Sequence, residues 1–283
     1  MSRRVCSPMI AMVVIVLSLT GCSPTAKTSS PVQPIITSQQ SVDAGQPKQA
    51  PQKWVPPQGD NDFPAAGVPF LYYHSITSLP GNVAGVPPAE FAAQMKYLYD
   101  AGFSPISLDQ FYAAYQGRGK LPRKPVVITF DDGYPDNYTV AFPILKQYNF
   151  TAAFFVVTSY MQPGQGMMTW DELREMQAYG MTIGSHTVNH LDLSKLSKTE
   201  QKNEIFQSKA KIEIELGVSV NYFCYPFGNF NQTTLSLLRQ AGYKLAVTTA
   251  SGTARQQDNL FLLKRVFVNG LHDLDDFKHR VSS

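Results

Sequence analysis

Cysteine is scarce in this sequence of 283 residues. The chain has Cys6, Cys22 and Cys224, and no paired spacing among them suggests a disulfide framework or a zinc ribbon. Charged residues make up only 16% of the chain and the formal net charge is +3, so the dense Lys and Arg clusters of nucleic-acid-binding proteins are missing. We therefore expect no nucleic-acid partner. Internal repeats are missing as well. Separately, we expect the protein to be a monomer.

Long apolar runs are also missing. The run Met9–Leu19 is too short to favour a membrane span, and it follows Arg3 and Arg4 as in a secretory signal. It ends in Leu-Thr-Gly-Cys at residues 19–22, which resembles the lipobox of bacterial lipoproteins. That resemblance implies cleavage before Cys22, lipid on its thiol, and a membrane-anchored protein outside the cytoplasm. The alternative is a plain secretory signal with an incidental cysteine.

Composition divides the chain into three parts. Residues 1–21 are predicted as a lipoprotein signal peptide. Residues 22–62 are rich in Ser, Pro, Gln and Thr and bury too little apolar surface to offset the entropy of ordering, so they are predicted as a disordered tether. Residues 63–283 are predicted as the catalytic domain, because short apolar runs there alternate with amphipathic stretches.

This alternation predicts an α/β fold. Seven apolar runs are typical of strands: 68–73, 125–130, 152–157, 181–184, 222–225, 244–248 and 262–268. Helix signals lie between them, namely capping boxes at 107–110 and 169–172, an amphipathic helix over 199–216 stopped by Gly217, and an N-cap at Asn231. About seven strand–helix units favour a distorted (β/α) barrel, whose active site lies at the C-terminal ends of the strands.

Two adjacent carboxylates follow the predicted strand 125–130. The run Thr-Phe-Asp-Asp-Gly puts Asp131 and Asp132 on the rim where a barrel carries its chemistry, and Gly133 permits the turn that splays them. On its own, the run fits a solvated Asp-Gly turn equally well.

Two histidines follow the predicted strand 181–184. His186 and His190 are spaced i, i+4 and can face one metal if the backbone is helical there, although exposed or helix-capping histidines show the same spacing. With Asp132 they offer two imidazoles and a carboxylate, which leaves a position open for water. A divalent metal would lower the pKa of that water. The donor set suits zinc, with cobalt, nickel or iron as alternatives.

The two motifs in this order resemble the polysaccharide deacetylases of carbohydrate esterase family 4, over roughly residues 68–270. The resemblance implies a metal-dependent enzyme. Carried over onto this sequence, Asp131 is the general base, and Asp132, His186 and His190 hold the metal.

The third motif of that family matches only in part. Pro-Phe-Gly is present at residues 226–228, and the resemblance implies that the Phe227 N–H stabilises an oxyanion. The arginine that normally accompanies the base is replaced by Cys224, which we interpret as a buried apolar residue. Arg265 is a candidate substitute. The alternative, a surface or structural ion pair, is the interpretation we favour slightly from the sequence.

The late histidine of the family is absent as well. His272 and His279 lie in polar helical sequence and are most simply surface residues. His74, at the end of the first predicted strand, is instead the candidate acid, as in the family branch that acts on poly-β-1,6-N-acetylglucosamine. The alternative for His74 is a core histidine bonded to backbone.

The resulting hypothesis is hydrolysis of N-acetyl groups from an N-acetylglucosamine polysaccharide, with poly-β-1,6-N-acetylglucosamine as the first choice of substrate. A peptidoglycan or chitin-oligomer deacetylase is the alternative within the same chemistry. A carbohydrate-binding module on a non-catalytic scaffold is the alternative of another class. The intact set of Asp131, Asp132, His186 and His190 speaks against it, because a module that only binds sugar does not need them all.

Overall fold

The computed structural model describes residues 53–161 and 164–282. Seven parallel strands form a closed ring in the order β1-β8-β7-β6-β5-β4-β3, and β3 pairs back to β1. The ring strands are β1 (Phe70–Tyr73), β3 (Pro125–Asp132), β4 (Ala153–Val156), β5 (Thr182–Ser185), β6 (Tyr222–Cys224), β7 (Leu245–Ser251) and β8 (Leu263–Phe267). The predicted barrel is therefore confirmed. A further short strand, β2 (Ser104–Pro105), pairs with β3 and was not predicted.

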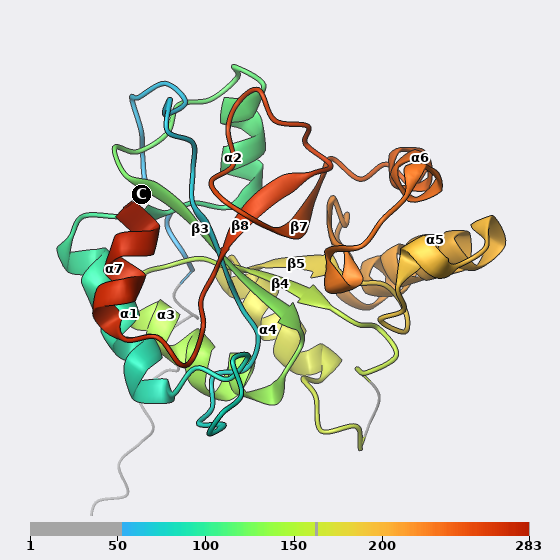
Figure 1. Cartoon of the computed structure of the whole chain (residues 1–283), viewed down its shortest axis with the longest axis horizontal. Helices are drawn as coiled ribbons and strands as arrows, with labels where there is room; N and C mark the ends of the chain where they lie inside the picture. Colours follow the sequence, from blue (N-terminus) through green and yellow to red (C-terminus); the bar gives the residue numbers. More distant parts are fainter. Residues whose placement is uncertain (1–52, 162–163, 283) are drawn as a thin grey trace, which may run out of the picture. The chain divides into compact units, whose positions relative to one another are not determined.

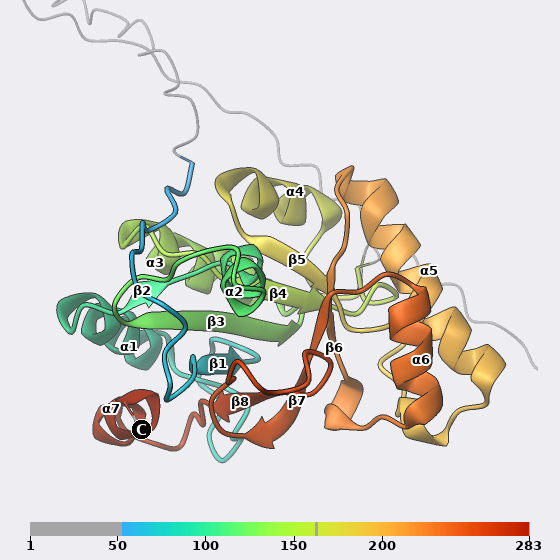
Figure 2. The same ribbon diagram turned by 90° about the horizontal axis from the view of Figure 1, so that it is seen from above.

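Helices surround the ring. They are α1 (Pro88–Asp100), α2 (Leu108–Tyr115), α3 (Phe142–Gln147), α4 (Trp170–Tyr179), α5 (Lys198–Leu216), α6 (Gln232–Gln240) and α7 (Leu274–Ser282), with the short helices η1 (Asn137–Ala141), η2 (Leu193–Lys195) and η3 (Pro226–Gly228) between them. Helices α5 and α6 lie side by side on one flank of the barrel, and α1 and α7 lie together on another (Figure 1, Figure 2). No helix in the described part of the chain has the length and apolar character needed to cross a membrane.

The helix boundaries follow the local signals in the sequence. Ser107 and Thr169 form the capping boxes of α2 and α4, as predicted. Helix α5 begins after a third capping box at Ser197 and ends at Gly217, whose φ of 66° is left-handed and favours glycine. Asn231 caps α6. Each cap satisfies N–H groups that the first turn of a helix leaves without intrahelical partners.

Alternate side chains of each strand face opposite sides of the ring. On β3, Ile128 and Phe130 belong to the core beneath the outer helices, whereas Val127 belongs to a second apolar cluster inside the barrel. Phe111 of α2 joins that inner cluster and contacts Phe70, with ring centroids 4.7 Å apart. The interior is therefore apolar towards the N-terminal ends of the strands, and its polar groups gather at the other end.

The folded part begins before the boundary predicted at residue 63. Trp54 is buried, and its backbone N–H donates to the Tyr179 carbonyl. It packs against Gly180, where a Cβ atom would lie only 2.9 Å from the Trp54 side chain. A lone tryptophan in a proline-rich stretch was assigned to the tether, but its large apolar surface is buried against the barrel. The predicted signal peptide, residues 1–21, and the rest of the tether up to residue 52 lie outside the described residues.

Candidate active site

Asp131 and Asp132 end β3 and point to different surroundings. Asp131 continues the inward-facing row of β3 and is 3% exposed, whereas the Asp132 side chain is 15% exposed. Asp132 and Gly133 both have left-handed backbones, with φ of 73° and 94°. Two such residues in succession turn the chain sharply, so the neighbouring carboxylates diverge as predicted. The strand itself runs two residues beyond its predicted end.

His186 and His190 come together through a tight turn after β5. We expected a helical backbone between the two histidines. That expectation was wrong, because Thr187 and His190 have φ of 72° and 58°. The two Nε2 atoms nevertheless lie 3.2 Å apart, and each is 3.4 Å from Asp132 Oδ1. Left-handed residues in this turn thus bring the two rings together without a helix.

The donor set fits a divalent cation. Asp132 Oδ1 is buried and accepts no hydrogen bond within the described structure. The Nδ1 atom of His186 lies 2.8 Å from the Cys224 carbonyl oxygen. A carbonyl only accepts, so Nδ1 carries a proton, and in the neutral ring this leaves the lone pair on Nε2, an arrangement typical of metal-binding histidines. The ligand atoms of Asp132, His186 and His190 all lie within 4.8 Å of one another.

The two imidazoles differ in their affinity for a proton. Burial opposes the charged form of both. The nearby carboxylates of Asp132 and Asp131 nevertheless raise the pKa of His186, whereas burial and the charge of His186 lower the pKa of His190. The pair therefore favours one positive charge over two, next to the Asp132 carboxylate. A bound metal cation would supply the positive charge beside Asp132 that a proton on His186 otherwise supplies.

Arg265 lies beside Asp131, inside the barrel. Its Nη1 and Nη2 atoms donate to the two carboxylate oxygens of Asp131 at 2.9 and 2.7 Å, and its side chain is fully buried. Burial alone would raise the pKa of Asp131, but the charge and hydrogen bonds of Arg265 hold it well below its usual range. Arg265 is therefore not a surface residue, and it lies where the candidate substitute for the missing arginine would have to lie, beside Asp131. Arg265 comes from β8, so only closure of the barrel brings it next to β3.

Cys224 is fully buried, as predicted. Burial raises the pKa of its thiol, so the sulfur stays neutral at ordinary pH. Its Sγ lies 3.5 Å from Asp131 Oδ2 and 3.2 Å from Arg265 Nη2. The residue fills space against the ion pair.

His74 and Phe227 reach the same rim from β1 and η3. The His74 ring lies beside Phe267, with centroids 6.2 Å apart, and its charge contributes to lowering the pKa of both Asp131 and Asp132. Phe227 has φ 59°, is 58% exposed, and its ring meets that of His190 with centroids 4.7 Å apart. Among the described hydrogen bonds, none uses the Phe227 backbone N–H.

Known proteins are similar to this chain in sequence and fold. A family model described as polysaccharide deacetylase matches residues 118–246. The Bacillus subtilis protein YxkH, classed with these deacetylases, is 36% identical over 204 residues, which are 72% of this chain and 72% of YxkH. This chain belongs to the polysaccharide deacetylase family.

Two further polysaccharide deacetylase relatives are informative. Poly-β-1,6-N-acetyl-D-glucosamine N-deacetylase of Staphylococcus aureus is 29% identical over 230 residues, covering 75% of this chain and 76% of that enzyme. The structure of the Streptococcus pyogenes deacetylase PplD, in complex with acetate, superposes with a TM-score of 0.73 and 31% identity, covering 77% of this chain and 99% of PplD.

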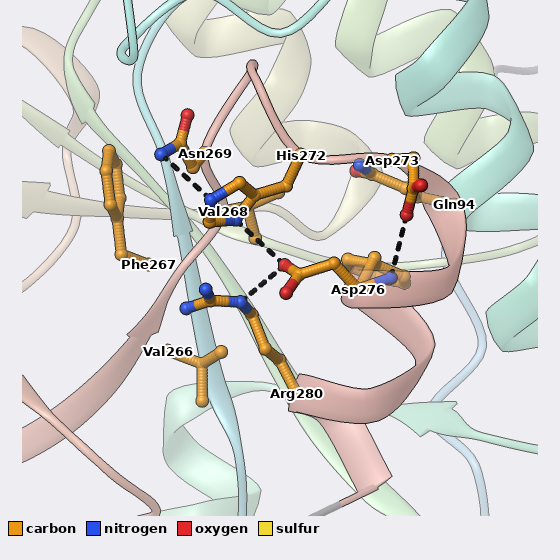
Figure 3. A pocket seen from close by; sticks show the side chains of 10 residues that line it. Gln94, Val266, Phe267, Val268, Asn269, His272, Asp273, Asp276 and Arg280 are labelled. Atoms are coloured by element: carbon orange, nitrogen blue, oxygen red, sulfur yellow. Dashed lines mark hydrogen bonds and ion pairs between the residues drawn. The ribbon is translucent and has the colours of Figure 1, made fainter.

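The late histidines take no place in this deacetylase site. His272 pairs with Asp276 at 2.8 Å and lies 3.5 Å from Asn269 Nδ2, beside a hollow of about 10 Å³ (Figure 3). A hollow of that size holds one water molecule at most. His279, further along α7, is exposed. Neither histidine replaces the family's late one.

Sequence reasoning missed two side chains of this deacetylase site. Tyr134 is half-buried. Burial, followed by the charge of Asp132, raises its pKa. Glu204 is buried on α5 and bonds the turn between the histidines. In a helix rich in Lys and Glu it is easily taken for solvent-facing. Its spacing with Ile205, Ser208 and Ile212 on the buried face was the available signal.

Replacing Arg265 by methionine should destabilise the protein strongly. We expect the free energy of unfolding to fall by about 3–5 kcal/mol, because the Asp131 carboxylate would stay buried without its partner. Urea unfolding of the metal-free chain measures this. Lys264→Met, an exposed change on the same strand, should stay within about 0.5 kcal/mol of wild type. Adding Asp131→Asn to Arg265→Met should recover part of the loss. An Arg265→Met variant as stable as wild type would contradict this account of the ion pair.

Proposed function

We propose that this protein hydrolyses the N-acetyl groups of an N-acetylglucosamine polymer, with poly-β-1,6-N-acetylglucosamine as its substrate. The observation that carries the proposal is the cluster of Asp132, His186 and His190 beside the buried Asp131–Arg265 pair. The Staphylococcus aureus relative, named for this polymer, supports the choice of substrate. The acetate in the PplD structure supports acetate as the acyl product.

Each residue of the rim has a step to perform. A divalent metal held by Asp132, His186 and His190 would polarise the acetyl carbonyl and acidify the attacking water. Asp131, kept ionised and oriented by Arg265, accepts a proton from that water as oxygen adds to the acyl carbon. The Phe227 N–H donates to the carbonyl oxygen as negative charge develops there.

The C–N bond then breaks. His74 donates a proton to the amine nitrogen, because expelling an unprotonated amide anion is prohibitive, and an imidazole suits transfer near neutral pH. The products are acetate and a glucosamine unit with a free amine. At neutral pH that amine is cationic, so the polymer gains positive charge and its attraction to anionic surfaces rises.

Two other functions remain as alternatives. A peptidoglycan or chitin-oligomer deacetylase would use the same rim with a different sugar linkage, and the geometry of the reacting groups fits either. A carbohydrate-binding module would bind sugar without releasing acetate. The paired Asp131 and the orphaned Asp132 oxygen favour chemistry, because a binder gains nothing from burying them.

Acetate release from three substrates tests the proposal. We expect faster release from β-1,6-linked N-acetylglucosamine oligomers than from chitin oligomers or peptidoglycan. A chelator should abolish release, and added zinc or cobalt should restore it, because the attacking water would lose its acidity without the cation. Binding without release from any of the three would favour the module. Full activity in thoroughly metal-stripped protein would exclude the metal mechanism.

His74→Asn should keep bound metal and substrate affinity while turnover falls. A loss of about 10²–10⁴-fold in kcat is the usual contribution of a general acid or base, and Asp131→Asn should lose a similar amount. Zinc content by atomic absorption and steady-state kinetics measure the two effects. His272→Asn is the matched control, since His272 pairs with Asp276 of α7 and has no role in the proposed mechanism, and it should keep its turnover. Loss of metal in His74→Asn would make this histidine a ligand, and normal turnover would make it a packing residue.

We also propose that the protein is anchored in the cell envelope by lipid on Cys22, with the substrate outside the cytoplasm. The run Leu-Thr-Gly-Cys at residues 19–22 carries this proposal. Fatty-acid labelling should be present in the wild type, absent in Cys22→Ser, and unchanged in Cys6→Ser, because Cys6 lies in the cleaved segment. Labelling that survives Cys22→Ser would exclude the lipid anchor.

A further inference from the structure

Glu204 lies on the buried face of α5, directly against the turn that joins the two histidines. Its side chain is 5% exposed. Oε2 accepts hydrogen bonds from the backbone N–H groups of Val188 and Asn189, at 2.9 and 2.8 Å. Oε1 accepts from Asn189 Nδ2 at 2.7 Å. All three donors thus belong to the two residues just before His190.

These donors are uncharged amides, although the acceptor is a buried carboxylate. Taking a carboxylate out of water is unfavourable unless its oxygens are hydrogen-bonded. Charge-assisted bonds from amide N–H groups are the compensation seen here, and they are shorter and stronger than bonds between neutral groups. These three bonds therefore tie Val188 and Asn189 to helix α5.

The turn needs such a restraint. Thr187 is β-branched and has φ 72°, a backbone that such side chains rarely adopt, and His190 has φ 58°, which is uncommon outside glycine. Such conformations persist only where the surroundings over-determine them. Helix α5 supplies a second restraint one turn later, since the Ser208 hydroxyl lies 2.7 Å from Ser185 Oγ, which accepts from the Thr187 N–H.

We infer that Glu204 is a positioning residue for the metal site. It acts through the backbone of Val188 and Asn189, and it holds the strained turn in the one conformation that brings the two imidazole Nε2 atoms together at Asp132. Without it, the turn would relax towards ordinary backbone angles and the imidazoles would separate. The inference rests on the metal site proposed above.

Zinc affinity of the metal-free full-length chain tests the inference, measured by competition with a chromophoric chelator. Glu204→Ala and Glu204→Asp should weaken zinc binding about 10- to 100-fold, the usual effect of losing a group that orients metal ligands. The aspartate keeps the charge but lacks the reach. Glu204→Gln keeps the reach, and Asn189 can turn its amide to accept from it, so its zinc affinity should stay within about threefold of wild type.

Asn203→Ala is the matched control, because Asn203 is the exposed neighbour on the same helix. It should bind zinc as wild type does. Urea unfolding of each metal-free variant separates stability from affinity. If Glu204→Ala is too unstable to purify, the zinc affinity of Glu204→Asp tests the inference instead.

Two results would overturn the inference. The first is wild-type zinc affinity in Glu204→Ala and Glu204→Asp with only the unfolding free energy lowered, which would make Glu204 a structural residue. The second is a loss in Glu204→Gln as large as in Glu204→Asp, which would assign the effect to charge. A wild-type chain that binds no zinc would remove the proposed metal site together with this inference, whereas zinc binding that is insensitive to Glu204 leaves the proposed function intact.

Discussion

The buried ion pair between Asp131 and Arg265 organises the upper end of the barrel. Arg265 comes from β8 and pairs with Asp131 of β3, and its Nε donates to the Thr248 carbonyl of β7. Its guanidinium stacks on Tyr72 of β1 at 4.2 Å and touches the Cys224 sulfur of β6. One planar cation thus joins strands that are far apart in the sequence, in an interior that excludes water. A lysine has no planar fork to make these contacts together.

The pair also explains why two adjacent aspartates can have different tasks. Asp131 faces inward to a permanent positive charge and stays ionised, whereas Asp132 turns outward to two imidazoles and keeps an oxygen without a hydrogen bond. The left-handed backbone at Asp132 and Gly133 separates the two environments within one peptide unit. Both carboxyl groups have a lowered pKa, so their different neighbours, a guanidinium for Asp131 and two imidazoles for Asp132, distinguish them.

The rim depends equally on restraints from outside the barrel. The histidine turn adopts unfavourable backbone angles and is braced by Glu204 and Ser208 of α5. The loop after β1 is braced in the same way, since Asn137 donates to the His74 carbonyl, and Asp136 accepts from Ser75 Oγ and the Ile76 N–H. Rigid elements behind strained loops are what holds reacting groups to the tolerance that catalysis needs.

The sequence by itself determined the barrel, its seven strands to within a few residues at each end, and the caps of α2, α4, α5 and α6, because alternation and capping are local signals. It also identified Asp131, Asp132, His186, His190 and Cys224, since each is read from a motif at a strand end. Tertiary structure alone decided the partner of Asp131, because Arg265 follows it by more than a hundred residues and meets it only when the ring closes. It also decided the non-helical histidine turn, the hydrogen-bond partners of Glu204 and the packing of Trp54, because positive φ angles and contacts between distant segments are not encoded by any local pattern of residues.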